Sequence, residues 1–140
     1  AQMLRMLLQA GGDLGAEDYG RRTPVERAVE CGSLIEAAAL LRAGAEGRKP
    51  DTPPPRLGWL LRLAEGRPRM FRLLLENGAH PPPGCATRRG VDRRLAEEIE
   101  QLEARLAEAG WSDAQRRETK RRIRGCRECQ ALLTARDAAA

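Results

Sequence analysis

The stretch "YGRRTPVERAVECGSLIEAAALLRAGAE", residues 19–46, indicates how the N-terminal half of this chain folds. Thr23 is a favourable helix N-cap, and Pro24 suits the first helical position, where its missing N–H leaves no bond unmade. The apolar side of this first helix is formed by Val25, Ala28 and Val29. Gly32 breaks the helix, and a second apolar set repeats every three or four residues: Leu34, Ile35, Ala38 and Leu41. Two helices of about eight to ten residues are unstable alone in water, so they need a neighbour to stack on.

The end of this stretch recurs twice elsewhere, as "LLQAGGD" at 7–13 and "LLENGAH" at 74–80. The first glycines of the three copies are Gly11, Gly44 and Gly78, which are 33 and 34 residues apart. A Leu-Leu pair followed by two helix-compatible residues and a glycine is typical of a helix that ends in a left-handed C-cap. A fixed period of this length predicts a repeat protein.

The chain resembles the ankyrin repeat at these residues. The family's markers correspond to Gly20, Thr23, Pro24, Val25, Ala28, Gly32, Leu40, Leu41, Gly44 and Ala45. Glu26 replaces the usual histidine, the third copy has Leu57-Gly58 in place of Thr-Pro, and the first copy keeps only its outer helix. The resemblance implies an all-α helical solenoid over residues 1–80, with a partial first repeat followed by repeats at 18–46 and 50–80.

The C-terminal part has a different pattern, which predicts an antiparallel helical hairpin over 91–137 after a Pro/Gly linker at 81–90. Its first helix has a heptad-like, coiled-coil stripe of apolar residues: Leu95, Ile99, Leu102, Leu106 and Ala109. Gly110 is expected as a C-cap, and Ser112 with Gln115 as the capping box of a second helix from about 113 to 136. Residues 92–109 carry 3 basic and 6 acidic side chains and residues 113–137 carry 8 and 4, so the helices have complementary charge. We expect this hairpin to cap the last repeat.

Composition agrees with an all-α chain and limits where it acts. Hydrophobic residues make up 41% of the sequence and aromatic residues only 3%, which favours helix packing through small side chains. No apolar run approaches the length of about 20 residues that crosses a bilayer, so we expect no membrane partner. The four cysteines come without a secretory signal, which favours an intracellular, cytoplasmic protein, with the nucleus left open. The chain begins inside what looks like a helix pair, and we expect it to be a fragment or part of something longer.

Two clusters have chemical interpretations besides a structural one. The segment "RRETKRRIRGCR", 116–127, holds seven basic residues and one acid and would place phosphate-binding side chains along one helix: Arg116, Arg117, Lys120, Arg121 and Arg124. The alternative is a solvated face that answers the acidic partner helix. Cys126 and Cys129, with His80 and Cys85, could ligate zinc, but cysteines on an apolar helix side also behave as small hydrophobes. We expect no metal and no cofactor.

Catalysis has little support in the sequence. It contains one histidine, no Gly-x-Ser-x-Gly, no phosphate-binding loop and no His-Glu-x-x-His. We therefore expect neither an enzyme nor a small-molecule substrate.

The ankyrin resemblance implies a concave binding face made of inner helices and hairpin tips. In this chain that face comprises Asp18, Tyr19, Arg21, Arg22, Glu26 and Arg27 of the middle repeat, with Arg56, Trp59 and Leu60 of the third. Trp59 has an alternative place in the core. We therefore predict a non-catalytic protein–protein interaction module, a scaffold or adaptor subunit of a larger intracellular assembly. The alternative is a nucleic-acid-associated protein that binds phosphates through the helix at 116–127.

Overall fold

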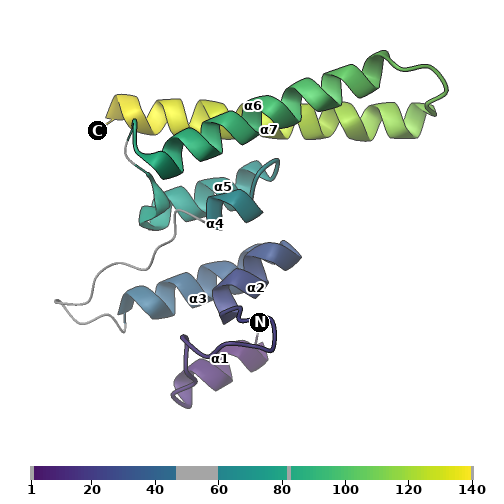
Figure 1. Ribbon diagram of the computed structural model, residues 1–140. Helices are drawn as coiled ribbons and strands as arrows, with labels where there is room; N and C mark the ends of the chain where they lie inside the picture. The colour runs from purple at the N-terminus through teal and green to yellow at the C-terminus, as the bar shows by residue number, and fades with distance from the viewer. Residues whose placement is uncertain (1, 47–59, 82, 140) are drawn as a thin grey trace. The chain divides into compact units, whose positions relative to one another are not determined.

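The computed structural model describes residues 2–46, 60–81 and 83–139, which form α-helices joined by turns and contain no strand. The expected all-α class is therefore confirmed. The chain divides into two compact units, residues 1–55 and 56–140, which we call unit 1 and unit 2 and describe separately (Figure 1). None of the helices in the described ranges combines the length and the apolar character needed to span a bilayer.

Unit 1 contains α1 (Gln2–Gln9), α2 (Pro24–Cys31) and α3 (Leu34–Glu46). Thr23 and Glu26 form the capping box of α2: the Thr23 N–H donates to Glu26 Oε2 at 2.9 Å, and the Glu26 N–H donates to Thr23 Oγ1 at 3.5 Å. Gly32 ends α2 in the left-handed conformation, with φ of 75°. This turn reverses the chain and lays α3 beside α2 (Figure 1). The buried side chains of the pair are Ala28, Val29, Ala37, Leu40 and Leu41.

Two expectations for the second helix of this pair are wrong. Ile35, expected on the buried face, is 70% exposed. Residues 34–41 are apolar at seven of eight positions, so the sequence leaves the direction of the buried face poorly determined. Gly44 lies inside α3 instead of ending it, because the helix continues through Ala45 to Glu46, which are good helix formers. The corresponding Gly11 and Gly78 do have positive φ, as predicted.

Unit 2 begins with a short helix pair. It consists of α4 (Leu60–Leu63) and α5 (Pro68–Leu74), which continues as one wider turn, η2 (Leu75–Ala79), up to the positive φ of Gly78. Pro68 occupies the first turn of α5, where its missing N–H costs nothing. The pair buries most of its apolar side chains: Leu60, Leu61, Ala64, Met70, Phe71, Leu74, Leu75 and Ala79.

The hairpin consists of α6 (Ala86–Ala107) and α7 (Asp113–Ala139), which lie antiparallel along each other (Figure 1). Helix α6 begins earlier than residue 91, inside the segment expected as a linker, because Cys85 acts as its N-cap: its Sγ accepts the Arg88 N–H at 3.3 Å. The predicted capping box of α7 is confirmed, but the C-cap of α6 is Glu108 and not Gly110, because the helix already ends at Ala107. Gly110 has φ of 93°, the Ser112 N–H donates to Gln115 Oε1 at 2.8 Å, and the Gln115 N–H donates to Ser112 Oγ at 3.2 Å.

The hairpin core is made of two facing apolar rows. Helix α6 contributes Val91, Leu95 and Leu102, and α7 contributes Ile123, Cys126, Cys129 and Leu133. Of the predicted stripe on α6, Ile99 and Leu106 are half-buried and Ala109 is exposed. Helix α7 also packs directly against the α4–α5 turn. The approach is close enough to require glycine at position 125, since a Cβ atom there would lie only 2.4 Å from the Gly66 carbonyl oxygen.

Candidate functional site

The first candidate site is the turn at residues 18–22, which we call the Tyr19 turn. The Asp18 carboxylate accepts hydrogen bonds from the Gly20 N–H at 2.8 Å and the Arg22 N–H at 3.0 Å. The Asp18 N–H donates to the Arg22 carbonyl at 3.0 Å, and the Arg21 N–H donates to the Asp18 carbonyl at 2.9 Å. The backbone hydrogen bond from Arg22 is the largest cause that lowers the pKa of Asp18 from its usual value. Asp18 therefore stays ionised and holds the turn closed at neutral pH.

The charged residues around this turn mostly bind one another. The Arg22 guanidinium pairs with the Glu30 carboxylate, which also binds Arg27 at 3.3 Å. Arg22 Nε, 3.7 Å from the Asp18 carboxylate, is buried and lacks a hydrogen-bond partner. Glu26 is occupied by the capping box of α2. Four of the residues expected on the binding face therefore shape the turn and the start of α2.

Tyr19 is different, because its side chain is fully exposed, with a relative accessibility of 111%. It occupies the second position of the turn that the Arg21 N–H closes on Asp18, and Arg21 beside it is also exposed. Leu60, placed on the same face by the sequence, is 2% exposed and belongs to the core of unit 2. Arg56 and Trp59 lie outside the described residues.

The second candidate site is a row of cations on α7, which we call the basic stripe. It comprises Arg117, Lys120, Arg121 and Arg124, all of them exposed. At 100° per residue these four side chains fall within an arc of about 100° on the helix surface. None of the four has an ion pair or side-chain hydrogen bond within the part of the chain that the structure describes.

Neighbouring arginines of the same helix are already engaged. Arg122 pairs with Glu98 and Arg127 with Glu103, both across the hairpin. Arg116, which the sequence grouped with the phosphate-binding residues, is half-buried and donates to the carbonyl oxygens of Leu106 at 3.2 Å and Glu108 at 3.4 Å. It thus satisfies carbonyls at the end of α6, which helix termini leave without partners.

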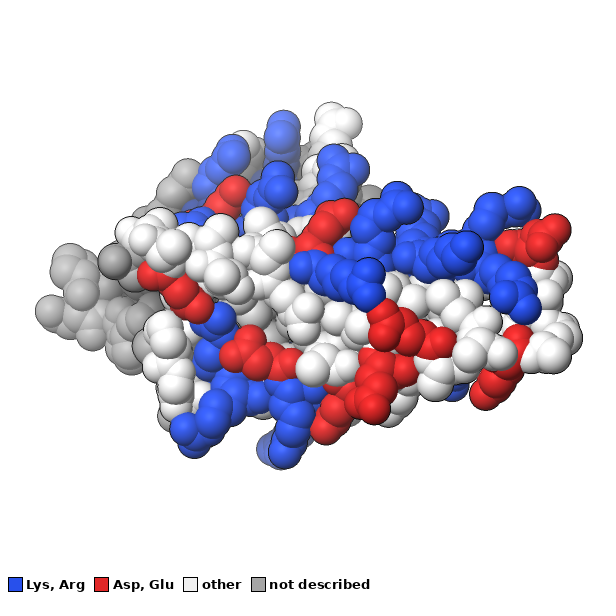
Figure 2. All heavy atoms as spheres, turned by 90° about the horizontal axis from the view of Figure 1, so that it is seen from above, with Lys and Arg blue, Asp and Glu red and all other residues white. Residues whose placement is uncertain are grey.

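Figure 2 shows the hairpin from above, with blue basic side chains gathered most densely along the upper right of the view. Red acidic side chains lie mainly below them, and further blue side chains lie at the lower left. In sequence terms, unit 2 carries 18 basic and 12 acidic side chains, whereas unit 1 carries 7 and 8. The positive charge of the protein is therefore concentrated in unit 2.

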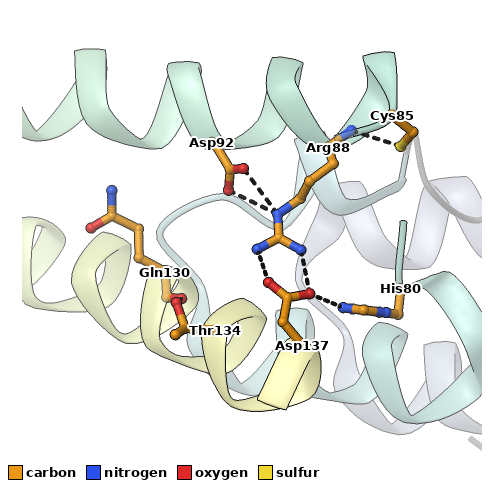
Figure 3. Close-up of polar contacts among 7 residues, drawn as sticks. All are labelled: His80, Cys85, Arg88, Asp92, Gln130, Thr134 and Asp137. Atoms are coloured by element: carbon orange, nitrogen blue, oxygen red, sulfur yellow. Dashed lines mark hydrogen bonds and ion pairs between the residues drawn. The ribbon is translucent and has the colours of Figure 1, made fainter. Parts of the chain in front are cut away.

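A third polar cluster joins His80, Arg88, Asp92 and Asp137 (Figure 3). The Arg88 guanidinium donates to both oxygens of Asp137, at 2.8 and 2.6 Å, and its Nε lies 3.0 Å from the Asp92 carboxylate. His80 Nε2 lies 3.0 Å from the first Asp137 oxygen. These hydrogen bonds, those of Arg88 foremost, lower the pKa of Asp137 and raise the pKa of Arg88.

This cluster joins the start of α6, through Arg88, to the end of α7, through Asp137, and we call it the tie. Arg88 is only 6% exposed, and its cation faces two carboxylates, which compensates the burial of the charge. Cys85 lies at the opposite end of Arg88 from His80, where its sulfur accepts the backbone N–H that opens α6 (Figure 3). Within this cluster the imidazole of His80 therefore binds Asp137, while the thiol of Cys85 binds the backbone of α6. Only the Arg88–Asp92 pair has a signal in the sequence, namely its spacing of four residues. Asp137 is 49 residues from Arg88, so the sequence does not indicate their contact.

The four candidate zinc ligands have separate places. Cys126 and Cys129 are buried in the hairpin core, and burial raises the pKa of both thiols, that of Cys129 to about 12. Metal binding needs the thiolate, which this environment disfavours. His80 binds Asp137 and Cys85 caps α6. The described ranges contain no group of three or more His, Cys, Asp or Glu residues arranged to hold a metal ion.

Comparison of the chain with protein-family models, with curated proteins and with solved structures gave no match.

Proposed function

We propose that this chain is a non-catalytic protein–protein interaction module, a scaffold or adaptor subunit of a larger assembly, and that its partner contacts the Tyr19 turn. The observation that carries the proposal is a fully exposed tyrosine on a turn closed by four hydrogen bonds. The resemblance of residues 18–46 to the ankyrin repeat implies the same location, because it would make this turn a hairpin tip of the binding face.

The chemistry of tyrosine suits this role. Its ring offers a large contact area with few rotatable bonds, and tyrosine is enriched among the residues that dominate binding energy at interfaces. The turn is already ordered before a partner arrives, so association pays little entropy to fix the backbone. Arg21, exposed beside it, adds a cation that can bind a carboxylate of the partner.

The polar residues of the same region support recognition over catalysis. Asp18, Glu26 and Glu30 each accept hydrogen bonds or ion pairs that hold the turn and the start of α2. Carboxylates held in this way keep the shape of the turn, which gives a partner a preformed surface to bind.

Site-specific photo-crosslinking tests the proposal. A photoreactive phenylalanine analogue replaces Tyr19 in one variant and Ile35 in a matched control, because Ile35 is also exposed in unit 1 but lies on α3. We expect position 19 to give a defined protein adduct in cell lysate that survives nuclease treatment and a rise in salt from about 50 to about 200 mM. The adduct should be absent at position 35.

A second variant, Tyr19→Ala, keeps every hydrogen bond of the turn, since none of them uses the tyrosine side chain. It should lose capture of the cross-linked partner while the helical signal in circular dichroism is unchanged. Equal adducts at positions 19 and 35, or capture that survives Tyr19→Ala, would contradict the proposal.

A further inference from the structure

We propose that the basic stripe of α7 binds the phosphate backbone of double-helical nucleic acid. This site is independent of the Tyr19 turn, which belongs to the other unit. The stripe has four exposed cations on one face of a helix, and no carboxylate of the described residues is paired with them.

The contrast within α7 supports this assignment. Arg122 and Arg127 are of the same residue type and lie on the same helix, yet they reach across to acidic residues of α6. The acidic residues of α6 therefore do not neutralise the stripe. This differs from the alternative interpretation, in which all the basic residues of 116–127 pair with the acidic helix. Unpaired surface cations retain their full attraction for an external anion.

The dimensions of the stripe match a phosphate backbone. From Arg117 to Arg124 the helix rises about 10 Å, at about 1.5 Å per residue. Along a duplex, each strand presents one phosphate per about 3.4 Å, so this length faces about three phosphates of one strand. Four flexible cations within an arc of about 100° can therefore engage three to four phosphates together.

The surroundings of the stripe favour a polyanion over a protein partner. An open groove of about 510 Å³ runs beside the stripe and is lined by Lys120 and Arg124 together with Glu103, Glu128 and the apolar Leu106, Ile123 and Ala131. Because Glu103 and Glu128 would repel phosphates inside this groove, we expect the polyanion to bind the exposed cationic face of the helix and not the groove. All the large hydrophobic side chains that are exposed in the described residues lie in unit 1. A protein or membrane partner would lack an apolar anchor here, whereas counterion release suffices to bind nucleic acid.

A duplex suits this surface better than a single strand. Proteins that hold single strands stack bases on aromatic side chains, and none of the stripe residues is aromatic. The stripe recognises phosphates alone, so it should bind without sequence preference and accept both DNA and RNA duplexes.

Fluorescence anisotropy with labelled 20-base-pair duplexes tests the proposal on the full chain. The stripe variant replaces all four cations by glutamine: Arg117→Gln, Lys120→Gln, Arg121→Gln and Arg124→Gln. The control variant makes the same change of charge at four exposed arginines elsewhere in unit 2, with no side-chain partner among the contacts of the described residues: Arg69→Gln, Arg72→Gln, Arg105→Gln and Arg136→Gln. Glutamine is a good helix former, so both variants should keep their helical content.

We expect the wild-type affinity to fall about 100-fold between about 50 and 200 mM salt, with a log–log slope of about −3 to −4. The stripe variant should bind at least about tenfold more weakly, with a slope near zero, and the control variant should change less than about threefold. A single strand of the same sequence should bind more weakly than the duplex, and Tyr19→Ala should not change duplex affinity.

Equal losses in the stripe and control variants would overturn the proposal, because binding would then follow net charge and not this face. Stripe-dependent binding of an acidic helical peptide or of anionic vesicles, without binding of either duplex, would overturn it as well. Failure of the Tyr19 cross-linking experiment would leave this result unaffected.

Discussion

Replacement of Gly125 by alanine in α7 should destabilise unit 2, although the same change normally stabilises a helix. In a helix interior, alanine is favoured over glycine by about 1 kcal/mol. At Gly125 the new Cβ would lie 2.4 Å from the Gly66 carbonyl oxygen and 3.2 Å from its carbonyl carbon. Carbon–oxygen contacts normally lie at about 3.3 Å or more, so α7 and the α4–α5 turn must separate by about 1 Å.

The cost of that separation can be compared with the gain in helix propensity. A gap of about 1 Å forfeits up to about half of the dispersion energy of each contact it opens, and overpacking of this kind costs about 1–3 kcal/mol. The obstacle is backbone and not a flexible side chain, so we take the upper part of that range. Subtraction of about 1 kcal/mol of propensity leaves a net destabilisation of about 1–2 kcal/mol.

Gly90→Ala is the matched control. Gly90 lies inside α6, and a Cβ there would have no atom within 4 Å, so only the propensity gain of up to about 1 kcal/mol remains. Urea unfolding followed by tryptophan fluorescence measures both, because both tryptophans of the chain belong to residues 56–140. We expect free energies of unfolding about 2–3 kcal/mol apart. If Gly125→Ala is as stable as Gly90→Ala, the close packing of α7 on Gly66 is refuted.

Three further predictions concern pH, thiol reactivity and capping. Arg88 lowers the pKa of Asp137 in the folded protein, so the pair stabilises the fold at pH values above the unfolded pKa of about 4, and this stabilisation is lost as the pH falls below that value. Asp137→Asn should therefore make the free energy of unfolding less sensitive to acid. An unchanged pH profile would contradict the tie. Burial raises the pKa of Cys129 to about 12, so its thiol is protonated and shielded at pH 8. A disulfide reagent should therefore modify exposed Cys31 rapidly and Cys129 only in urea, whereas equal rates would show that the core is open. Thr23→Ala removes the capping box and should cost about 1 kcal/mol, seen as faster amide exchange in α2, while Thr23→Ser should restore protection.

Features set by residues close in the sequence were the ones that could be predicted. The N-cap at Thr23, the helix break at Gly32 and the Ser112–Gln115 box each depend on residues within a few positions of one another. The part that Glu26 plays in the cap of α2 was not predicted. Their backbone requirements are local, so the sequence carries them directly. The all-α class follows from the same local signals.

Features that depend on contacts between distant residues could not be predicted. The tie to Asp137 joins positions 49 and 57 residues apart, and the approach of Gly125 to Gly66 depends on how two helices meet. For the same reason, the sequence identified only part of the set of exposed phosphate-binding candidates correctly. Arg116 and Arg117 are neighbours of identical type, and only the position of the end of α6 assigns one to its carbonyls and leaves the other exposed.

The tie between His80, Arg88 and Asp137 also bears on the order in which unit 2 folds. The middle of the hairpin closes a short loop, and Arg122 and Glu98 are only 24 residues apart, so its contacts can form early. The tie must close loops of 49 and 57 residues, so we expect it to form late in folding. Once formed, it holds the last turns of α7, where a helix would otherwise fray, and makes them part of the cooperative structure.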